Sequence, residues 1–168
     1  MTTKEFLEYY NNTFDSIGKD IILEFFIAFS RFEFALKASN FVKGGERVSA
    51  NWDTFVNLIA NDFNPNSSIE LKTATHYIIT NPPQVQSLHE NNIVWSKRNI
   101  EANTPIINKL RLHITDIRNN LFHGGKFNDT FSPENSRNYV LLKSAIIILN
   151  NWLELSPEIN SNFSLEIS

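Results

Sequence analysis

The chain has 168 residues, of which 42% are hydrophobic and 12% aromatic, including 14 phenylalanines, and its net charge is −3. This composition is typical of one globular domain with a genuine core, and it excludes a disordered chain or a general nucleic-acid coat protein. Cysteine is absent, which excludes disulfides, thiolate chemistry and cysteine-based metal sites.

The apolar residues recur with helical spacing along almost the whole chain. In the first half this spacing predicts helices over residues 4–14, 17–39, 52–60 and 69–79. Large apolar residues cover so much of the second of these helices that we expect it to be buried on several sides. Asn51 or Ser49 is the candidate N-cap of the third.

The second half begins with Asn81-Pro82-Pro83, which ends the fourth helix because proline lacks an N–H and restricts the residue before it. Residues 86–102 are ambiguous, and we predict partial helix around Trp95. A further helix is predicted from Thr104, as N-cap, with Pro105 as its first residue. It ends near His123, where two glycines follow.

Ser132-Pro133-Glu134 is predicted to open the last long helix, and Ser156-Pro157 to end it. The tail, residues 156–168, is expected to fray. We therefore predict an all-α bundle of about five to six helices, with one domain over residues 1–168, a core over 17–155 and no strand hairpin.

The N-terminal residues lack the basic-then-apolar pattern of a signal peptide, and the longest apolar runs are too short or too interrupted to span a bilayer. We expect a cytoplasmic protein without a membrane anchor. No glycine-rich phosphate loop, His-Glu-x-x-His pattern or carboxylate cluster occurs, so we expect no metal and no cofactor.

The segment Arg118-Asn119-Asn120-Leu121-Phe122-His123 is the most informative for function. Arginine offers a rigid fork of donors for phosphate oxygens, and histidine both takes and gives a proton near neutral pH. The two are enough to cleave RNA without a metal. An ideal helix places positions 118 and 123 about 140° apart, so we expect His123 to lie at the helix end beside Arg118.

The distribution of charge also points to this segment as the functional one. Residues 97–126 carry six lysines and arginines against two carboxylates, a net charge of +4. A phosphate-bearing substrate needs such a basic surface, but a solvated helix face of no special function has the same composition.

Each site residue also has a structural interpretation. Arg118 could pair with a carboxylate such as Glu33, and His123 could cap carbonyl groups at the helix end. Glu33 itself either pairs with Lys37 one turn on or holds Arg118 or His123 in position without contacting the substrate. Lys126 either holds a neighbouring phosphate or is an inert loop lysine.

Three other histidines and the tryptophans are expected to be structural. We predict that His113 is packed in the core and that His76 and His89 are structural or at the surface. The three tryptophans are expected to anchor the core rather than to stack on bases.

The Arg118-Asn119-x-x-x-His123 pattern, late in a helical domain of this length, resembles the signature of the HEPN superfamily. That signature is an arginine, a polar residue and then a histidine after four to six intervening residues. The segments 31–37 and 118–127 also resemble those of stand-alone bacterial members, and the helix order resembles theirs over most of residues 17–155.

The resemblance implies a metal-independent endoribonuclease that acts as a homodimer on RNA. A 2′-hydroxyl would attack the adjacent phosphate and leave a 2′,3′-cyclic phosphate. His123 would be the general base or acid, Arg118 would bind the scissile phosphate, and Asn119 would orient one of these groups. Such proteins serve as toxins, anti-phage effectors or RNA-processing enzymes.

An alternative remains open from the sequence. The chain could be a non-catalytic HEPN module that binds nucleotide or RNA, or that pairs with a protein such as a nucleotidyltransferase antitoxin encoded nearby. An interaction scaffold with a coincidental Arg/His pair is the third hypothesis.

Overall fold

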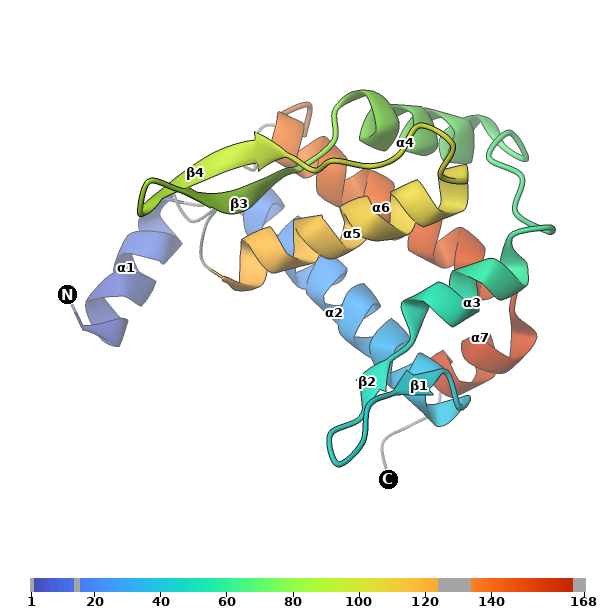
Figure 1. The fold of residues 1–168 in the computed structure, drawn as a ribbon. Coiled ribbons are helices and arrows are strands. Elements are labelled where there is room, and N and C mark those ends of the chain that lie inside the picture. Colours follow the sequence, from blue (N-terminus) through green and yellow to red (C-terminus); the bar gives the residue numbers. More distant parts are fainter. Residues whose placement is uncertain (1, 14–15, 124–133, 165–168) are drawn as a thin grey trace.

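The computed structural model describes residues 2–13, 16–123 and 134–164 (Figure 1). Within them the chain forms seven helices and two antiparallel two-stranded ribbons. The helices are α1 (Thr3–Thr13), α2 (Ser16–Ala38), α3 (Trp52–Ile59), α4 (Ile69–Thr80), α5 (Ile106–Phe122), α6 (Arg137–Glu154) and α7 (Pro157–Ser164). The fold is therefore broadly helical, as expected, but it is not purely all-α.

The main departure from the predicted fold is a hairpin of β3 (Gln84–His89) and β4 (Asn92–Lys97). The prediction of helix around Trp95, and of no strand hairpin, was wrong. Glu90 and Asn91 form the two-residue turn with φ of 47° and 63°. Two successive positive φ values give the turn the twist that joins antiparallel strands, and here they arise without the glycine that usually signals such a turn.

A second, minimal ribbon pairs β1 (Val42–Lys43) with β2 (Ser49–Ala50). Its loop requires glycine at position 44, because φ there is 108° and a β-carbon would lie 2.3 Å from the carbonyl oxygen of Arg47.

Several helix ends follow their sequence signals. Asn51 caps α3, and its Oδ1 accepts a hydrogen bond from the backbone N–H of Thr54 at 3.2 Å. At α5 the boundary is shifted by one residue, because Pro105 rather than Thr104 is the N-cap. It offers no side-chain hydrogen bond to the helix.

The last long helix begins later than predicted. Ser136 caps α6 by accepting from the N–H of Tyr139 at 3.4 Å, so Glu134 lies before the helix. Ser132 and Pro133 lie outside the described residues. Pro157 stops α6, as expected, but it also opens α7, because proline is well tolerated in the first turn of a helix.

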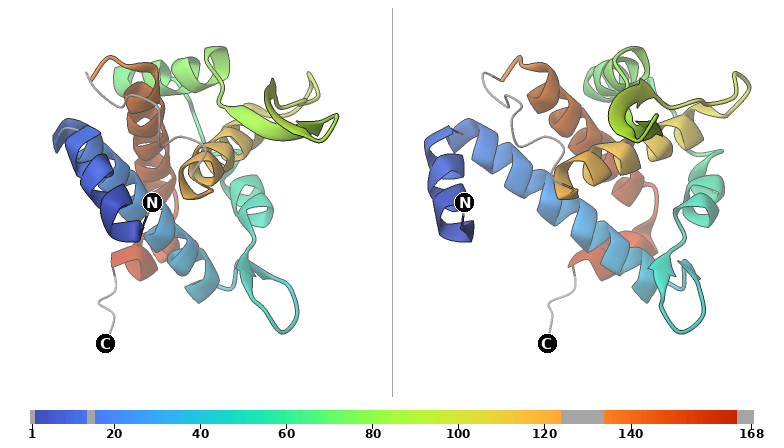
Figure 2. Two further views of the ribbon diagram at one scale, coloured as in Figure 1. Left: turned by 90° about the vertical axis from the view of Figure 1, so that its left-hand side faces the viewer. Right: turned by 60° about the vertical axis from the view of Figure 1, so that its left-hand side comes forward.

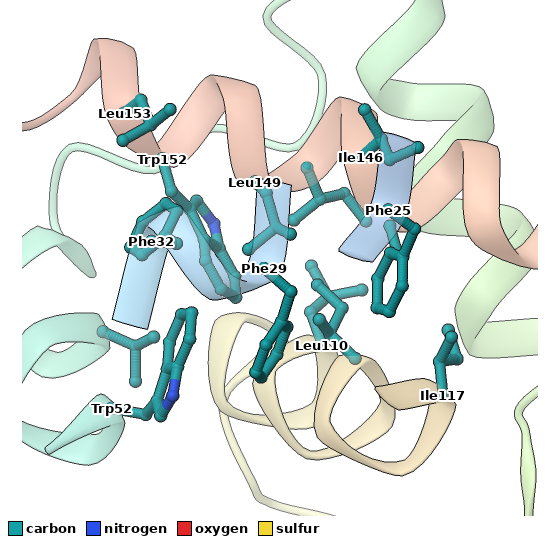
Figure 3. Packing of buried hydrophobic residues seen from close by; sticks show 14 of the residues in the cluster. Phe25, Phe29, Phe32, Trp52, Leu110, Ile117, Ile146, Leu149, Trp152 and Leu153 are labelled. Atoms are coloured by element: carbon teal, nitrogen blue, oxygen red, sulfur yellow. The ribbon is translucent and has the colours of Figure 1, made fainter. Parts of the chain in front are cut away.

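The core is rich in aromatic rings and lies between α2, α3, α5 and α6 (Figure 3). Trp152 of α6 is fully buried, and Trp52 of α3 stacks on Phe32 of α2 with ring centroids 5.0 Å apart. These two tryptophans anchor the core as predicted. Trp95 does not, because it lies half-buried in β4.

Helix α2 is buried on one side only, which corrects the expectation that it is buried on several. Phe25, Phe29 and Phe32 point into the core. Four large residues on the opposite side stay exposed, with relative exposures of 41–56%, and we call them the outer face of α2: Leu23, Phe26, Ile27 and Phe34. Their spacing of three, one and seven residues places them along one line of the helix.

The segment after residue 156 is ordered and packed as far as Ser164. Ile159 of α7 is fully buried, and the Nδ2 of Asn162 donates to the hydroxyl of Ser39 at 2.7 Å. The Nε of Arg31 donates to the carbonyl of Phe163 at 3.1 Å, where a cation is favoured by the negative end of a helix. Residues 157–164 thus extend the packed region beyond residue 155.

The β3–β4 hairpin projects from the helices (Figure 2), and polar contacts hold its base. Arg98, just after β4, makes two hydrogen bonds to the carboxylate of Asp116 on α5, one of them from Nε at 2.7 Å. Asp116 is 2% exposed. Nearby, the Nδ2 of Asn120 donates to the carbonyl of Gln84 at 2.8 Å.

A search of the described helices for a membrane-spanning segment finds none with the length and apolar character that a bilayer requires.

We expect Asp116→Asn to lower the free energy of unfolding by about 1–3 kcal/mol, because a buried carboxylate that accepts from a guanidinium is replaced by a weaker acceptor. The loss should appear as a lower urea midpoint and as faster amide exchange in the hairpin. Asp53→Asn is the matched control, since Asp53 pairs with Arg111 but its side chain is 49% exposed. It should cost less than about 1 kcal/mol. Equal losses in the two variants would contradict this account.

Candidate functional site

Arg118 lies in the last turns of α5 and is half-buried. Its Cζ lies 4.8 Å from the ring centroid of Phe122 and 5.8 Å from that of Phe29. Its Nη1 donates to the Oδ1 of Asn119 at 3.0 Å. Among the described residues no carboxylate pairs with Arg118, so the interpretation of Arg118 as a partner of Glu33 is wrong. Two rings and an amide orient the guanidinium without neutralising its charge.

His123 is the C-cap of α5, and its backbone N–H donates to the carbonyl of Asn119 at 2.9 Å. The side chain is exposed, and its imidazole has no partner within the described part of the chain. Because α5 is regular through Phe122, Arg118 and His123 lie about 140° apart around the axis and roughly 7.5 Å apart along it. The two groups share the end of one helix, but no interaction joins them.

The other site residues of the sequence analysis fall elsewhere. Glu33 accepts a hydrogen bond from the Nε1 of Trp52 at 3.2 Å, and in the described residues it pairs with neither Lys37 nor Arg118. Glu33 therefore provides the acceptor for an indole N–H at the edge of the core. Lys126 lies outside the described residues, as do the two glycines before it.

Ion pairs reduce the charge of the basic segment. Arg98 pairs with Asp116 and Arg111 pairs with Asp53, so two of its arginines are compensated by carboxylates. The Nζ of Lys109 donates to the carbonyl of Ala102 at 3.0 Å. The net charge of +4 is thus not a uniform basic surface, and Arg118, near the end of α5, is an arginine of the segment that no described carboxylate compensates.

Aromatic neighbours of the site were missed by the sequence analysis. Phe122 is 46% exposed and stacks on Phe26 of α2, which is 44% exposed, with ring centroids 5.3 Å apart. Phe122 lies inside the motif, so its place could have been inferred. Phe26 is distant in sequence, and no local signal indicates the contact.

His113 is packed in the core, as predicted, at 6% exposure. Its Nδ1 is buried without a hydrogen-bond partner in the described residues. Burial lowers the pKa of His113 below its ordinary value, and the nearby carboxylate of Asp116 opposes this effect only in part. His113 is one turn from Asp116 and belongs to the packing of α5 rather than to the site.

Within the described residues, no three acidic or histidine side chains cluster closely enough to hold a metal ion.

Comparison of the chain with protein-family models, curated proteins and solved structures gives no match. The resemblance to the HEPN superfamily therefore stays a prediction from the motif and the helix order.

We expect stability to fall as the pH drops below about 6.5, the ordinary pKa of histidine, because the unfolded chain then binds a proton that buried His113 resists. The loss should continue down to the lowered pKa of the folded state and should be absent at higher pH. Asparagine cannot titrate, so in His113→Asn the melting temperature should change less with pH between about pH 7.5 and 5. His89→Asn, in the exposed hairpin, is the control. Parallel curves for wild type and His113→Asn would refute this role.

Proposed function

We propose that the chain is a metal-independent endoribonuclease of the HEPN type, with its reactive groups at the end of α5. One observation carries the proposal: the guanidinium of Arg118 is held by Asn119 and by the rings of Phe122 and Phe29, without a carboxylate among the described residues. A structural arginine in a half-buried position usually has a counter-charge. An exposed imidazole follows five positions later on the same helix.

In the proposed reaction, a 2′-hydroxyl of RNA attacks the adjacent phosphorus and the bond from phosphorus to the 5′-oxygen breaks. His123 takes the proton from the 2′-hydroxyl or gives one to the leaving 5′-oxygen. Arg118 binds the non-bridging oxygens, on which negative charge grows in the transition state. Asn119 keeps the guanidinium in place. The products are a 2′,3′-cyclic phosphate and a 5′-hydroxyl.

A second copy of the chain completes this site in our proposal. One imidazole cannot be base and acid in the same step, and Arg118 and His123 of one chain point to different sides of α5. The outer face of α2 leaves four large apolar residues exposed, and Phe26 of this face stacks on Phe122 of the motif. An apolar stripe along one side of a helix is a candidate surface for association. Pairing through this face would place two motifs next to each other.

The biological role follows the same proposal: a toxin, an anti-phage effector or an RNA-processing enzyme of the cytoplasm, silenced by an antitoxin or a nucleotidyltransferase partner. The non-catalytic alternative differs in one measurable respect. It requires RNA or nucleotide binding that depends on Arg118 and no turnover.

We expect His123→Ala and Arg118→Ala each to slow cleavage of a mixed RNA pool by about a hundredfold or more, because each removes a group that acts in the transition state. Cleavage by the wild type should be unchanged in EDTA, and its products should end in a 2′,3′-cyclic phosphate. The control is His89→Ala, which removes an exposed histidine from the hairpin and should cleave normally. Melting temperatures confirm that the variants fold.

Cleavage that requires a divalent ion, or that survives in His123→Ala, would rule out this mechanism. Binding of RNA that is lost in Arg118→Ala, together with no turnover by the wild type, would favour the non-catalytic module.

The proposed dimer can be tested separately from the cleavage reaction. We expect the wild type to be a dimer in light scattering at micromolar concentration, and Leu23→Glu/Ile27→Glu to be a monomer that cleaves RNA poorly, because the outer face of α2 would carry buried charges. Leu58→Glu/Ile69→Glu is the matched control, since these two residues are also well exposed, on α3 and α4. A monomeric wild type that cleaves RNA would contradict the two-copy site.

A further inference from the structure

A row of three aromatic rings and one guanidinium runs from the core to the surface between α2 and α5. Phe29 is 3% exposed and lies 5.8 Å from the Cζ of Arg118, which lies 4.8 Å from the ring centroid of Phe122. Phe122 in turn stacks on Phe26, with ring centroids 5.3 Å apart and an angle of 21° between the ring planes. Figure 1 shows the last turn of α5 beside the middle of α2, where this row lies. The row is buried at Phe29 and open to solvent at Phe26.

The outer end of the row is an exposed pair of rings. Phe122 is 46% exposed and Phe26 is 44% exposed. On an ideal helix Phe26 points about 60° away from Leu23 and toward Phe29, so it lies at the edge of the outer face of α2 that is nearest to α5. Among the described residues, Phe122 is the one ring or cation that lies against Phe26. The exposed part of the Phe26 ring is therefore open to a further stacking partner.

The guanidinium in the same row has unused donors. Arginine carries several N–H donors in a planar fork, and the Nη1 of Arg118 donates to the Oδ1 of Asn119 at 3.0 Å. In the part of the chain that the structure describes, the guanidinium has no other acceptor and no carboxylate partner. A half-buried guanidinium of this kind favours an anionic ligand such as a phosphodiester.

A nucleotide matches this combination of exposed rings and an uncompensated guanidinium. Every nucleotide of a strand carries a phosphate for the guanidinium and a flat base that stacks on aromatic side chains. A protein partner would instead have to place a carboxylate and an apolar surface side by side at this point. In a duplex the bases are stacked inside the helix, so a single strand is the form that presents a base to the rings.

We propose that Phe26 and Phe122 form a stacking subsite for a nucleobase of single-stranded RNA, beside the phosphate that Arg118 binds. The proposal rests on the proposed function, because it takes RNA as the natural ligand and Arg118 as the phosphate-binding group. The base packs on the exposed ring of Phe26 and on the edge of Phe122, and a neighbouring phosphate of the same strand reaches Arg118. Stacking tolerates every base, so this subsite selects single strands rather than a sequence.

The test is a titration of the full chain with a short fluorescein-labelled deoxythymidine oligonucleotide, followed by fluorescence anisotropy. This strand lacks the 2′-hydroxyl, so the proposed reaction cannot cleave it. A strand of the same length with abasic sites carries the same phosphates without the bases. We expect the deoxythymidine strand to bind about tenfold or more tightly than the abasic strand at low salt, and also more tightly than a duplex of the same length.

Substitution of Phe26 separates stacking from simple apolar packing. Phe26→Leu keeps an apolar side chain but removes the π face. It should weaken binding of the deoxythymidine strand by about five- to tenfold and leave the abasic strand unchanged, whereas Phe26→Trp should bind the deoxythymidine strand at least as tightly as the wild type. Melting temperatures confirm that the variants fold.

Phe34→Leu is the matched control. Phe34 is 41% exposed on the outer face of α2 and also lies beside a guanidinium, since the Cζ of Arg31 is 4.9 Å from its ring centroid. It lies about two turns from Phe26 along α2, away from the motif. Phe34→Leu removes a ring from the same face and should bind both strands like the wild type.

The proposal is overturned if Phe26→Leu binds the deoxythymidine strand like the wild type, if it weakens both strands equally, or if the duplex binds as tightly as the single strand. An equal loss in Phe34→Leu would also overturn it, because the rings would then serve contact with another protein, such as a second copy of the chain.

The same experiments separate this subsite from the nuclease. Base-dependent binding that needs Phe26, without cleavage of RNA, would contradict the nuclease and support the subsite. Cleavage of RNA that needs Arg118 but has an unchanged KM in Phe26→Leu would support the nuclease and overturn the subsite.

Discussion

The ring of Phe29 belongs to the core and to the candidate site at the same time. It is 3% exposed, packs against Trp52 at 5.2 Å and Phe25 at 5.9 Å, and lies 5.8 Å from the guanidinium of Arg118. Because side chains in a close-packed core move little, Phe29 gives Arg118 a fixed support. The position of the guanidinium therefore depends on aromatic packing and on Asn119, and no carboxylate among the described residues neutralises its charge.

Elements with a strong local pattern were predictable. Helices α2 and α5 have long runs of apolar residues at helical spacing, and Asn51 and the prolines mark helix ends by mechanisms that act within a few residues. The β3–β4 hairpin was not predictable by the same means, because its turn uses Glu90 and Asn91 at positive φ without a glycine. The periodic pattern also did not reveal that one side of α2 stays uncovered.

The candidate site was likewise predictable only in part. Arg118, Asn119 and His123 are close in sequence, so their common place at the end of α5 could be predicted. The partners of other charged groups depend on tertiary packing, since Glu33 meets Trp52 across 19 residues and Arg111 meets Asp53 across 58. Sequence alone therefore overstated the free positive charge of the segment and misplaced Glu33.

The three tryptophans occupy different environments, and this provides built-in optical probes. Trp152 is fully buried, Trp52 is 8% exposed and bound to Glu33, and Trp95 is half-buried in the hairpin. Indole fluorescence moves to longer wavelength as water reaches the ring. In a chain that keeps only Trp95, emission reports on opening of the hairpin, whereas the core pair reports on global unfolding. Local and global transitions of this fold are thus separable by spectroscopy without an added label.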